Sequence, residues 1–346
     1  MLTPEFDAFL VRMPKVELHL HLEGSITPRT LLELAQRNSV ELPARDIQGV
    51  EQLFRYRNFS EFLTVFMSLA RALVHGEDFE RLAYELGLFL AQYHVLYAEV
   101  MISPMQHLQR GIDLSEAIAG AATGFGQAEA EGGPQVRLAL DYGRQYGPDN
   151  AWNVLEIAKA CRRYGLVAWS IGGNEIGNPP EPFAEIFAAA RAAGLHTMAH
   201  AGEVVGPASV WGAVDTLGAE RLGHGIRSVD DSRLLAHLRD RGVVLDVCPS
   251  SNIYTGAAHS WESHPLRRLY DAGVTLTINT DDPTFFHTTM VDEYRNAVRY
   301  FDFTIEDICA LVRNSVRGAF LKPTEQMMLL ERINGELKSL RTELGI

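Results

Sequence analysis

The stretch VELHLHLE, Val16–Glu23, decides the fold because it is an apolar run of strand length that carries two histidines two residues apart. Seven further short apolar runs follow, each bounded by Gly, Pro or Asp and separated by helix-length segments. They are VLYAEVMIS (95–103), VRLALDYG (136–143), LVAWSIGG (166–173), HTMAHAGE (196–203), RLGHG (221–225), VVLDVCPSS (243–251) and TLTINTDDP (275–283). Near-continuous apolar strands alternating with helices are typical of a buried parallel sheet. Eight such units predict an α/β fold, a (β/α)8 TIM barrel, with a doubly wound sheet as the alternative.

The segments outside these strands predict two additions to one barrel domain that spans 1–346. Residues 27–92 are too long for a plain crossover, and they show helical periodicity in NFSEFLTVFMSLARALV (58–74) and DFERLAYELGLFLAQY (78–93). We expect a helical insertion there that covers one end of the barrel. Residues 285–346 are expected to form C-terminal helices.

Composition narrows the class of partner. The chain of 346 residues has 31 basic and 44 acidic side chains, a net charge of −13, which argues against nucleic acid and anionic membranes as partners. A neutral or cationic small molecule fits better. The N-terminal segment has acidic residues where a signal peptide is basic, and no apolar run reaches about 18 residues, so we expect a cytoplasmic protein. The three widely spaced cysteines suit a reducing compartment, and the oligomeric state stays open.

Polar residues gather at the carboxyl ends of five of the eight strands. They are His19 and His21, His200 with Glu203, His224, Asp246, and Asp281 with Asp282. In a barrel these ends converge on the face that carries active sites. Residues two apart on a strand point the same way, so His19 and His21 face one point. With His200 and Asp281 they offer three nitrogens and one oxygen, a set suited to Zn²⁺ with one position left for water; the alternative is a set of purely structural histidines.

Proton carriers that do not bind metal are also present near these ends. Glu203 follows His200 by three residues, where Gly202 permits a tight turn. His224 lies between glycines, so its ring can approach a ligand, although a tolerated loop histidine is the alternative. Of the adjacent Asp281 and Asp282, we expect one to bind metal and the other to reach substrate; an Asx turn is the alternative for Asp282.

Other catalytic signatures are absent from the sequence. The H-x-E and P-C-x-x-C pattern of nucleobase deaminases is missing, as is H-E-x-x-H. SIGGNEIG (170–177) has no lysine after its glycines, which argues against a phosphate loop.

Together, MPKVELHLHLEGS, MAHAGE, RLGHGIR, VCPSSNIYTGA and TINTDDPTFF resemble, in order, the motifs of the adenosine deaminase family of amidohydrolase barrels. The resemblance implies a zinc-dependent hydrolytic deaminase of a 6-aminopurine nucleoside, giving the 6-oxopurine and ammonia. It implies one Zn²⁺ per chain, held by His19, His21, His200 and Asp281. It further implies that Glu203 protonates a ring nitrogen, that His224 orients or deprotonates the attacking water, and that Asp282 and the Gly173 N–H bind the purine. The fourth strand has no lysine, which favours one metal over two.

The departures from the family pattern concern the substrate. Adenosine deaminases commonly have Asp, associated with a ribose hydroxyl, where this chain has Glu23, so the resemblance makes Glu23 a candidate substrate-binding residue. Adenine deaminases tend to have the same HLEG. The free base is therefore the alternative substrate, although Gly223 and the Thr-Gly-Ala at 255–257 favour a nucleoside. A 5′-modified adenosine such as aminodeoxyfutalosine is a third possibility, with Arg144 as a candidate partner for its carboxylate and a solvated loop arginine as the alternative.

The aromatic run in the helical insertion offers an apolar wall for the sugar or its substituent. We expect Phe59 in the core, whereas Phe62, Leu63 and Phe66 are expected either to cover the site or to pack in the core of an amphipathic helix. Two other classes stay open: a single-metal amide or ester hydrolase, and a binding relative whose site has decayed.

Overall fold

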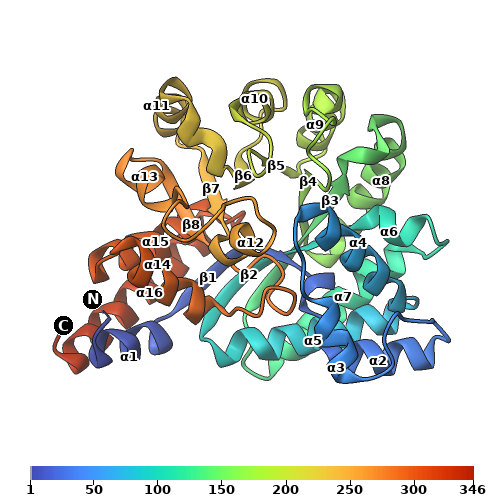
Figure 1. Ribbon diagram of the computed structural model, residues 1–346, viewed down its shortest axis with the longest axis horizontal. Helices are drawn as coiled ribbons and strands as arrows, with labels where there is room; N and C mark the ends of the chain where they lie inside the picture. The colour runs from blue at the N-terminus through green and yellow to red at the C-terminus, as the bar shows by residue number, and fades with distance from the viewer. Residues whose placement is uncertain (1) are drawn as a thin grey trace.

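Eight strands form one parallel sheet in chain order in the computed structural model, which describes residues 2–346 (Figure 1). They are β1 (Lys15–His21), β2 (Val95–Ile102), β3 (Gln135–Gly143), β4 (Leu166–Gly172), β5 (His196–Ala201), β6 (Arg221–His224), β7 (Val244–Val247) and β8 (Thr275–Ile278). A parallel bridge between Leu20 and Asp281 brings the segment after β8 back to β1, which nearly closes the barrel. The predicted (β/α)8 barrel is confirmed, and the doubly wound alternative is wrong because the sheet returns to its first strand.

Helices surround the barrel and fill its long connections. Between β1 and β2 lie α2 (Pro28–Arg37), α3 (Ile47–Leu53), α4 (Phe59–Leu69) and α5 (Gly76–Gln92). The others are α1 (Pro4–Arg12), α6 (Pro104–Leu108), α7 (Leu114–Ala130), α8 (Pro148–Cys161), α9 (Ala184–Ala192), α10 (Pro207–Trp211), α11 (Ser232–Arg241), α12 (Pro249–Tyr254), α13 (Leu266–Asp271), α14 (Met290–Phe301), α15 (Ile305–Gly318) and α16 (Pro323–Leu344). Within residues 2–346, the helices are too short or too polar to cross a membrane.

The helix α4 begins where its sequence predicts. The Asn58 side chain caps it by accepting a hydrogen bond from the Glu61 N–H. Phe62, Phe66 and Leu69 recur at helical spacing and are buried against the barrel. This helix therefore keeps one apolar face toward the strand ends.

The interior of the barrel below the strand ends is filled by an ionic cluster. Arg221 pairs with Glu99 at 2.6 Å and with Asp246 at 2.5 Å, and all three side chains are buried. The ring of Phe320, which follows α15, lies 4.2 Å from the Arg221 guanidinium. Asp246 is thus a partner of Arg221 inside the barrel, and the polar pattern at the strand ends includes one structural carboxylate.

Two compensating register shifts in β1, at Lys15/Val16 and in a bulge between Glu17 and Leu20, separate the direction of Glu17 from that of the histidines. Glu17 pairs with Ala98 and Leu20 pairs with Val100, so three steps along β1 match two steps along β2. The extra residue turns Glu17 to the helix side of the sheet, while His21 faces the barrel interior beside Met101. A regular strand would have placed Glu17 and His21 on the same side.

Asn279, directly after β8, holds this bulge. Its Oδ1 accepts hydrogen bonds from the backbone N–H groups of Leu18, at 2.8 Å, and His19, at 3.2 Å. Its Nδ2 donates to Thr277 Oγ1 at 2.8 Å, and the side chain is fully buried. The geometry of the two histidines therefore depends on a side chain far away in the sequence.

Candidate active site and metal centre

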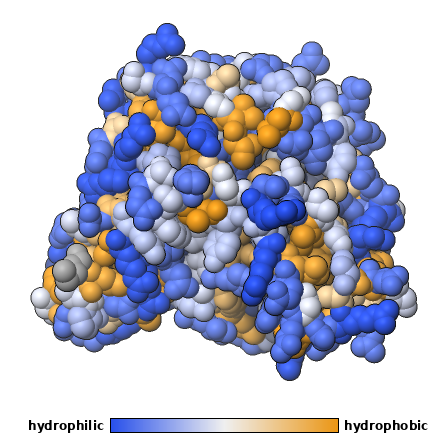
Figure 2. All heavy atoms as spheres, viewed as in Figure 1, coloured by the Kyte–Doolittle hydropathy of each residue, from blue (hydrophilic) through white to orange (hydrophobic). Residues whose placement is uncertain are grey.

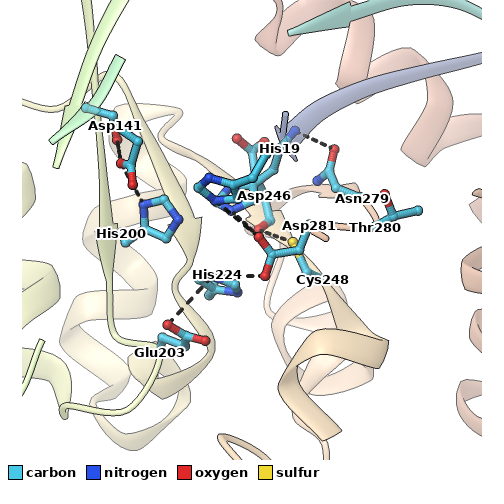
Figure 3. A network of polar contacts seen from close by, with 12 residues as sticks. His19, Asp141, His200, Glu203, His224, Asp246, Cys248, Asn279, Thr280 and Asp281 are labelled. Atoms are coloured by element: carbon cyan, nitrogen blue, oxygen red, sulfur yellow. Dashed lines mark hydrogen bonds and ion pairs between the residues drawn. The ribbon is translucent and has the colours of Figure 1, made fainter. Parts of the chain in front are cut away.

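The four predicted metal ligands meet at the carboxyl ends of the strands. His19 Nε2 lies 3.2 Å and His21 Nε2 lies 3.3 Å from the same Asp281 oxygen, Oδ1. Ligand atoms of His19, His200, His224 and Asp281 lie within 4.8 Å of one another, and an overlapping group consists of His21, Asp141 and His200. The structure thus brings the predicted set together, with His224 and Asp141 in its surroundings. Figure 3 shows His19, His200 and Asp281 of this set beside His224 and Asp141.

The free nitrogens of this cluster fit a divalent metal. Among the described residues, neither ring nitrogen of the buried His19 has a hydrogen-bond partner. His200 directs Nδ1 toward the Ile171 carbonyl and Asp141 Oδ1, both at 3.3 Å, which leaves Nε2 for the cluster. A histidine that binds metal usually donates its other N–H to a carbonyl or carboxylate, as His200 is placed to do. The donor set of imidazoles and one carboxylate suits Zn²⁺.

Two residues of the cluster have strained backbones. His224 has φ +61° and Asp281 has φ +66°, in the left-handed region that costs a side-chain-bearing residue about 1–3 kcal/mol. The neighbouring Gly223 leaves no room for a side chain, because a Cβ there would lie 2.6 Å from His19 Cε1. Strain and close packing at adjacent positions are typical of functional sites.

Glu203 lies beside the cluster on a turn held by another carboxylate. Its Oε2 is 3.7 Å from His224 Nε2. Glu175, from the predicted GGNE segment, accepts the backbone N–H groups of Gly202 at 2.6 Å and of Val204 and Val205 at 2.9 Å. Burial, and then the nearby Asp281, raise the pKa of Glu203 well above its usual value. Burial therefore favours the protonated form of Glu203, which can donate its proton.

Asp282 and Gly173 flank the same pocket. Burial, followed by the charge of Asp281, raises the pKa of Asp282 well above its usual value, and within residues 2–346 its Oδ1 has no hydrogen-bond partner. The carboxylate packs on the backbone of Gly24, where any side chain would overlap it. Gly173 adopts φ +78°, which favours glycine, and lies on the opposite wall of the pocket beside Gln145.

The pocket extends from the cluster to α4. The residues that line it are His21, Phe59, Phe62, Leu63, Phe66, Met67, Ser103, Met105, Gln106, Asp141, Gly143, Gln145, Tyr146, Gly173, His200, Glu203, His224, Asp281 and Asp282. Figure 2 shows apolar side chains at the surface in the region of α4. The apolar face of α4 therefore forms one wall of the pocket, and Phe59 belongs to this wall as well as packing against the core, which corrects its assignment to the core alone.

Two residues singled out for substrate binding lie outside the lining described for residues 2–346. Glu23 Oε1 accepts the Ser103 N–H at 2.9 Å and lies 2.8 Å from His107 Nε2. Its role as a substrate ligand stays a prediction, and these contacts favour a role in positioning the Ser103 segment. Arg144 is 1% exposed and donates to the backbone carbonyls of His200 and Asn178, so a solvated loop arginine is wrong.

The sequence patterns did not identify several residues that surround the site. Asp141 ends the third strand and could have been found by the same rule that found His200. Asn252, whose Nδ2 lies 3.1 Å from His224 Nδ1, was also missed, as were Glu175 and Asn279. These three residues act through contacts with partners far away in the sequence, for which the sequence carries no local signal.

Comparisons with known proteins agree with this geometry. The family model described as adenosine deaminase matches residues 14–336. The chain is 38% identical over 319 residues to the aminodeoxyfutalosine deaminase of Streptomyces avermitilis, covering 92% of this chain and 89% of that protein. It is 34% identical over 331 residues to the adenine deaminase of Hahella chejuensis, covering 96% and 99%. A solved amidohydrolase from Burkholderia ambifaria with bound Zn superposes with a TM-score of 0.92 at 31% identity, covering 100% and 96%. The chain therefore belongs to the adenosine deaminase family and is a hydrolytic deaminase.

Proposed function

We propose that this deaminase of adenosine-like or adenine substrates removes the amino group from carbon 6 of a purine nucleoside, which includes 5′-modified adenosines, and releases ammonia. The observation that carries the proposal is the position of Glu203. A buried carboxyl group with a raised pKa stands 3.7 Å from His224, next to the cluster of candidate metal ligands and in the lining of the pocket that extends to α4. Hydrolysis at an aromatic carbon requires this combination of a nucleophile and a proton donor.

A metal, proposed as one Zn²⁺ per chain, would be held by His19, His21, His200 and Asp281. When bound, it supplies a water-derived nucleophile at neutral pH by lowering the pKa of water to about 7. The donor types and the unpartnered nitrogens of His19 support this assignment.

The surrounding residues then bind the purine and move protons. Glu203 gives its proton to ring nitrogen 1 as oxygen bonds to carbon 6, which keeps negative charge off the ring. The amino group leaves as ammonia after it takes the proton of the new hydroxyl group, so one water is consumed per ammonia released. We assign Asp282 to a nitrogen of the imidazole part and the Gly173 N–H to a nitrogen of the pyrimidine part, and both line the pocket.

The side chains that line the pocket support a nucleoside. Gln106 and Gln145 offer hydrogen-bonding groups for sugar hydroxyls, and Phe59 and Met67 of α4 add apolar surface. Of residues 2–346, no Arg or Lys lines it, which argues against a phosphorylated substrate. A neutral nucleoside, with an apolar group at its 5′ end if it is modified, fits these walls.

The free base adenine is the second candidate, favoured by Glu23. This carboxylate is bound to His107 and Ser103, so it is already occupied at the position where adenosine deaminases have an Asp for ribose. A substrate without a ribose hydroxyl at this point would lose no hydrogen bond when Glu23 is occupied in this way.

Catalytic efficiencies for adenosine, deoxyadenosine, aminodeoxyfutalosine and adenine on one zinc-loaded preparation test the proposal. We expect at least one nucleoside to exceed adenine. Higher efficiency with adenine would assign the enzyme to the free base, and no ammonia from any of the four would contradict the proposed function.

A further inference from the structure

The side of His224 that faces away from the pocket contacts a buried chain of two polar residues. His224 Nδ1 lies 3.1 Å from Asn252 Nδ2, and Asn252 Oδ1 lies 3.1 Å from His264 Nε2. The chain ends on the protein backbone, because the N–H of Leu266 donates to His264 Nδ1 at 3.1 Å. His224, Asn252 and His264 are all at most 4% exposed, so water does not compete for these bonds.

The backbone end of this chain fixes the direction of every hydrogen bond in it. A backbone N–H can only donate, so His264 Nδ1 must accept and carries no proton. The proton of the neutral His264 ring is then on Nε2, which donates to Asn252 Oδ1. With its oxygen used as an acceptor, the Asn252 amide must present Nδ2 to His224 and donate to Nδ1.

The same logic determines which nitrogen of His224 carries the proton. Because Nδ1 accepts from Asn252, the proton of His224 is on Nε2. This nitrogen faces the pocket, 3.7 Å from Glu203 Oε2 and 4.0 Å from Asp281 Oδ2 (Figure 3). The opposite tautomer would place two donors against each other at Nδ1, in a site too buried for water to relieve the conflict.

We propose that Asn252 and His264 are positioning residues that hold His224 as the Nε2–H tautomer, so that His224 donates a hydrogen bond to the oxygen that attacks carbon 6 and does not remove its proton. This inference rests on the proposed function. It decides between the two roles that the family resemblance leaves open for His224, orienting the water or deprotonating it.

The proton balance then runs through Glu203 alone. A water that becomes the nucleophile loses one proton, and this proton goes to the Glu203 carboxylate, which passes it to ring nitrogen 1 as the new carbon–oxygen bond forms. His224 begins and ends the step with the same proton. A buried acid with a raised pKa is suited to hold the proton between these two events.

The first test is a long-range ¹H–¹⁵N correlation spectrum of the zinc-loaded protein with ¹⁵N-labelled histidine, with the His224 signals assigned by their loss in His224→Gln. We expect a protonated Nε2 and a bare Nδ1 for His224. A proton on Nδ1 with a bare Nε2 would overturn the inference. This readout requires no activity, so it separates failure of the inference from failure of the proposed function.

The second test is Asn252→Asp, which replaces the donor at Nδ1 by an acceptor of the same shape. Nδ1 of His224 should then become protonated. A neutral ring would offer a bare Nε2 to the attacking oxygen, while a charged ring would protonate it, so kcat should fall at least ~100-fold at unchanged zinc content, because a wrong tautomer of a catalytic histidine can cost about 10⁴.

The matched control is Ser251→Ala, on the same helix. Within the described chain its Oγ has no hydrogen-bond partner, so kcat should stay at the wild-type value. Wild-type kcat in Asn252→Asp with full zinc would overturn the inference. If Asn252→Asp does not fold, the spectrum of the wild-type protein decides alone.

Discussion

Replacing Asn279 by Ala should loosen the metal centre while leaving all four proposed metal ligands in the sequence. Its Oδ1 accepts the N–H groups of both Leu18 and His19 in the bulge of β1. Both bonds are buried, and the substitution leaves each N–H without an acceptor. A buried donor without a partner costs about 1–3 kcal/mol, so two should cost about 2–6 kcal/mol in the free energy of unfolding.

The same substitution should weaken zinc binding. Asn279 Oδ1 holds the backbone N–H of the proposed ligand His19, so a β1 that loses this acceptor would let the His19 imidazole shift from its place in the cluster. Loss of a residue that orients metal ligands typically costs about 10–100-fold in affinity, and we expect a loss of this size. Urea unfolding of the metal-free protein measures the first effect, and competition with a chelator measures the second.

Asn314→Ala is the matched control. Its Nδ2 donates one hydrogen bond to the Leu276 carbonyl in β8, away from the bulge. This variant should lose about 1 kcal/mol of stability and keep wild-type zinc affinity. Wild-type zinc affinity in a folded Asn279→Ala would refute the reasoning, because the hydrogen bonds from Asn279 to the β1 backbone would then not set the ligand geometry.

Three further outcomes are expected. Burial raises the pKa of Glu293 from 4.5 to about 7, so as pH rises the unfolded chain loses this proton first and stability falls between these values. Glu293→Gln can still form hydrogen bonds with Ser250 and Thr288. It should raise the free energy of unfolding by at most about 3 kcal/mol at about pH 8 and by less than about 1 kcal/mol at about pH 5. Urea titrations at both pH values would measure this difference. Phe62→Ala and Phe66→Ala in the α4 wall should raise KM for nucleosides more than for adenine in steady-state assays, and an equal rise for both would place the wall at the base. Removing metal with a chelator should abolish ammonia release, and one equivalent of Zn²⁺ should restore it; full activity without metal would refute the metal assignment.

The barrel could be predicted from the sequence because each strand carries its own signal. Eight apolar runs separated by helix-length segments determine both the strand type and the parallel order, and polar residues at strand ends determine the catalytic face. His19, His200 and Asp281 share one group of possible ligand atoms, and His21 lies 3.3 Å from Asp281 Oδ1, because the convergence of strand ends follows from topology. Predicting this convergence requires no knowledge of individual contacts. The role of these residues as metal ligands stays a prediction.

The residues that orient the site could not be predicted in this way. Asn279 and Asn252 work through hydrogen bonds to partners whose position depends on a bulge, a turn or a neighbouring helix. In the sequence, Arg144 resembled a solvent-exposed loop arginine. In the folded chain it is buried and donates a hydrogen bond to the His200 carbonyl. The pattern at strand ends also included Asp246, because a carboxylate paired with Arg221 inside the barrel looks the same in sequence as one that faces substrate.

The measurement that tests the account most directly is ammonia release from adenosine or the best nucleoside substrate by the wild-type protein and by Glu203→Gln at equal zinc content. Glu203 is the proposed donor of the proton to ring nitrogen 1, and loss of such a general acid should slow turnover by about 10²–10⁴-fold. Glu203→Gln with normal zinc and a wild-type rate would contradict the central claim, because the ring would then be protonated by another group.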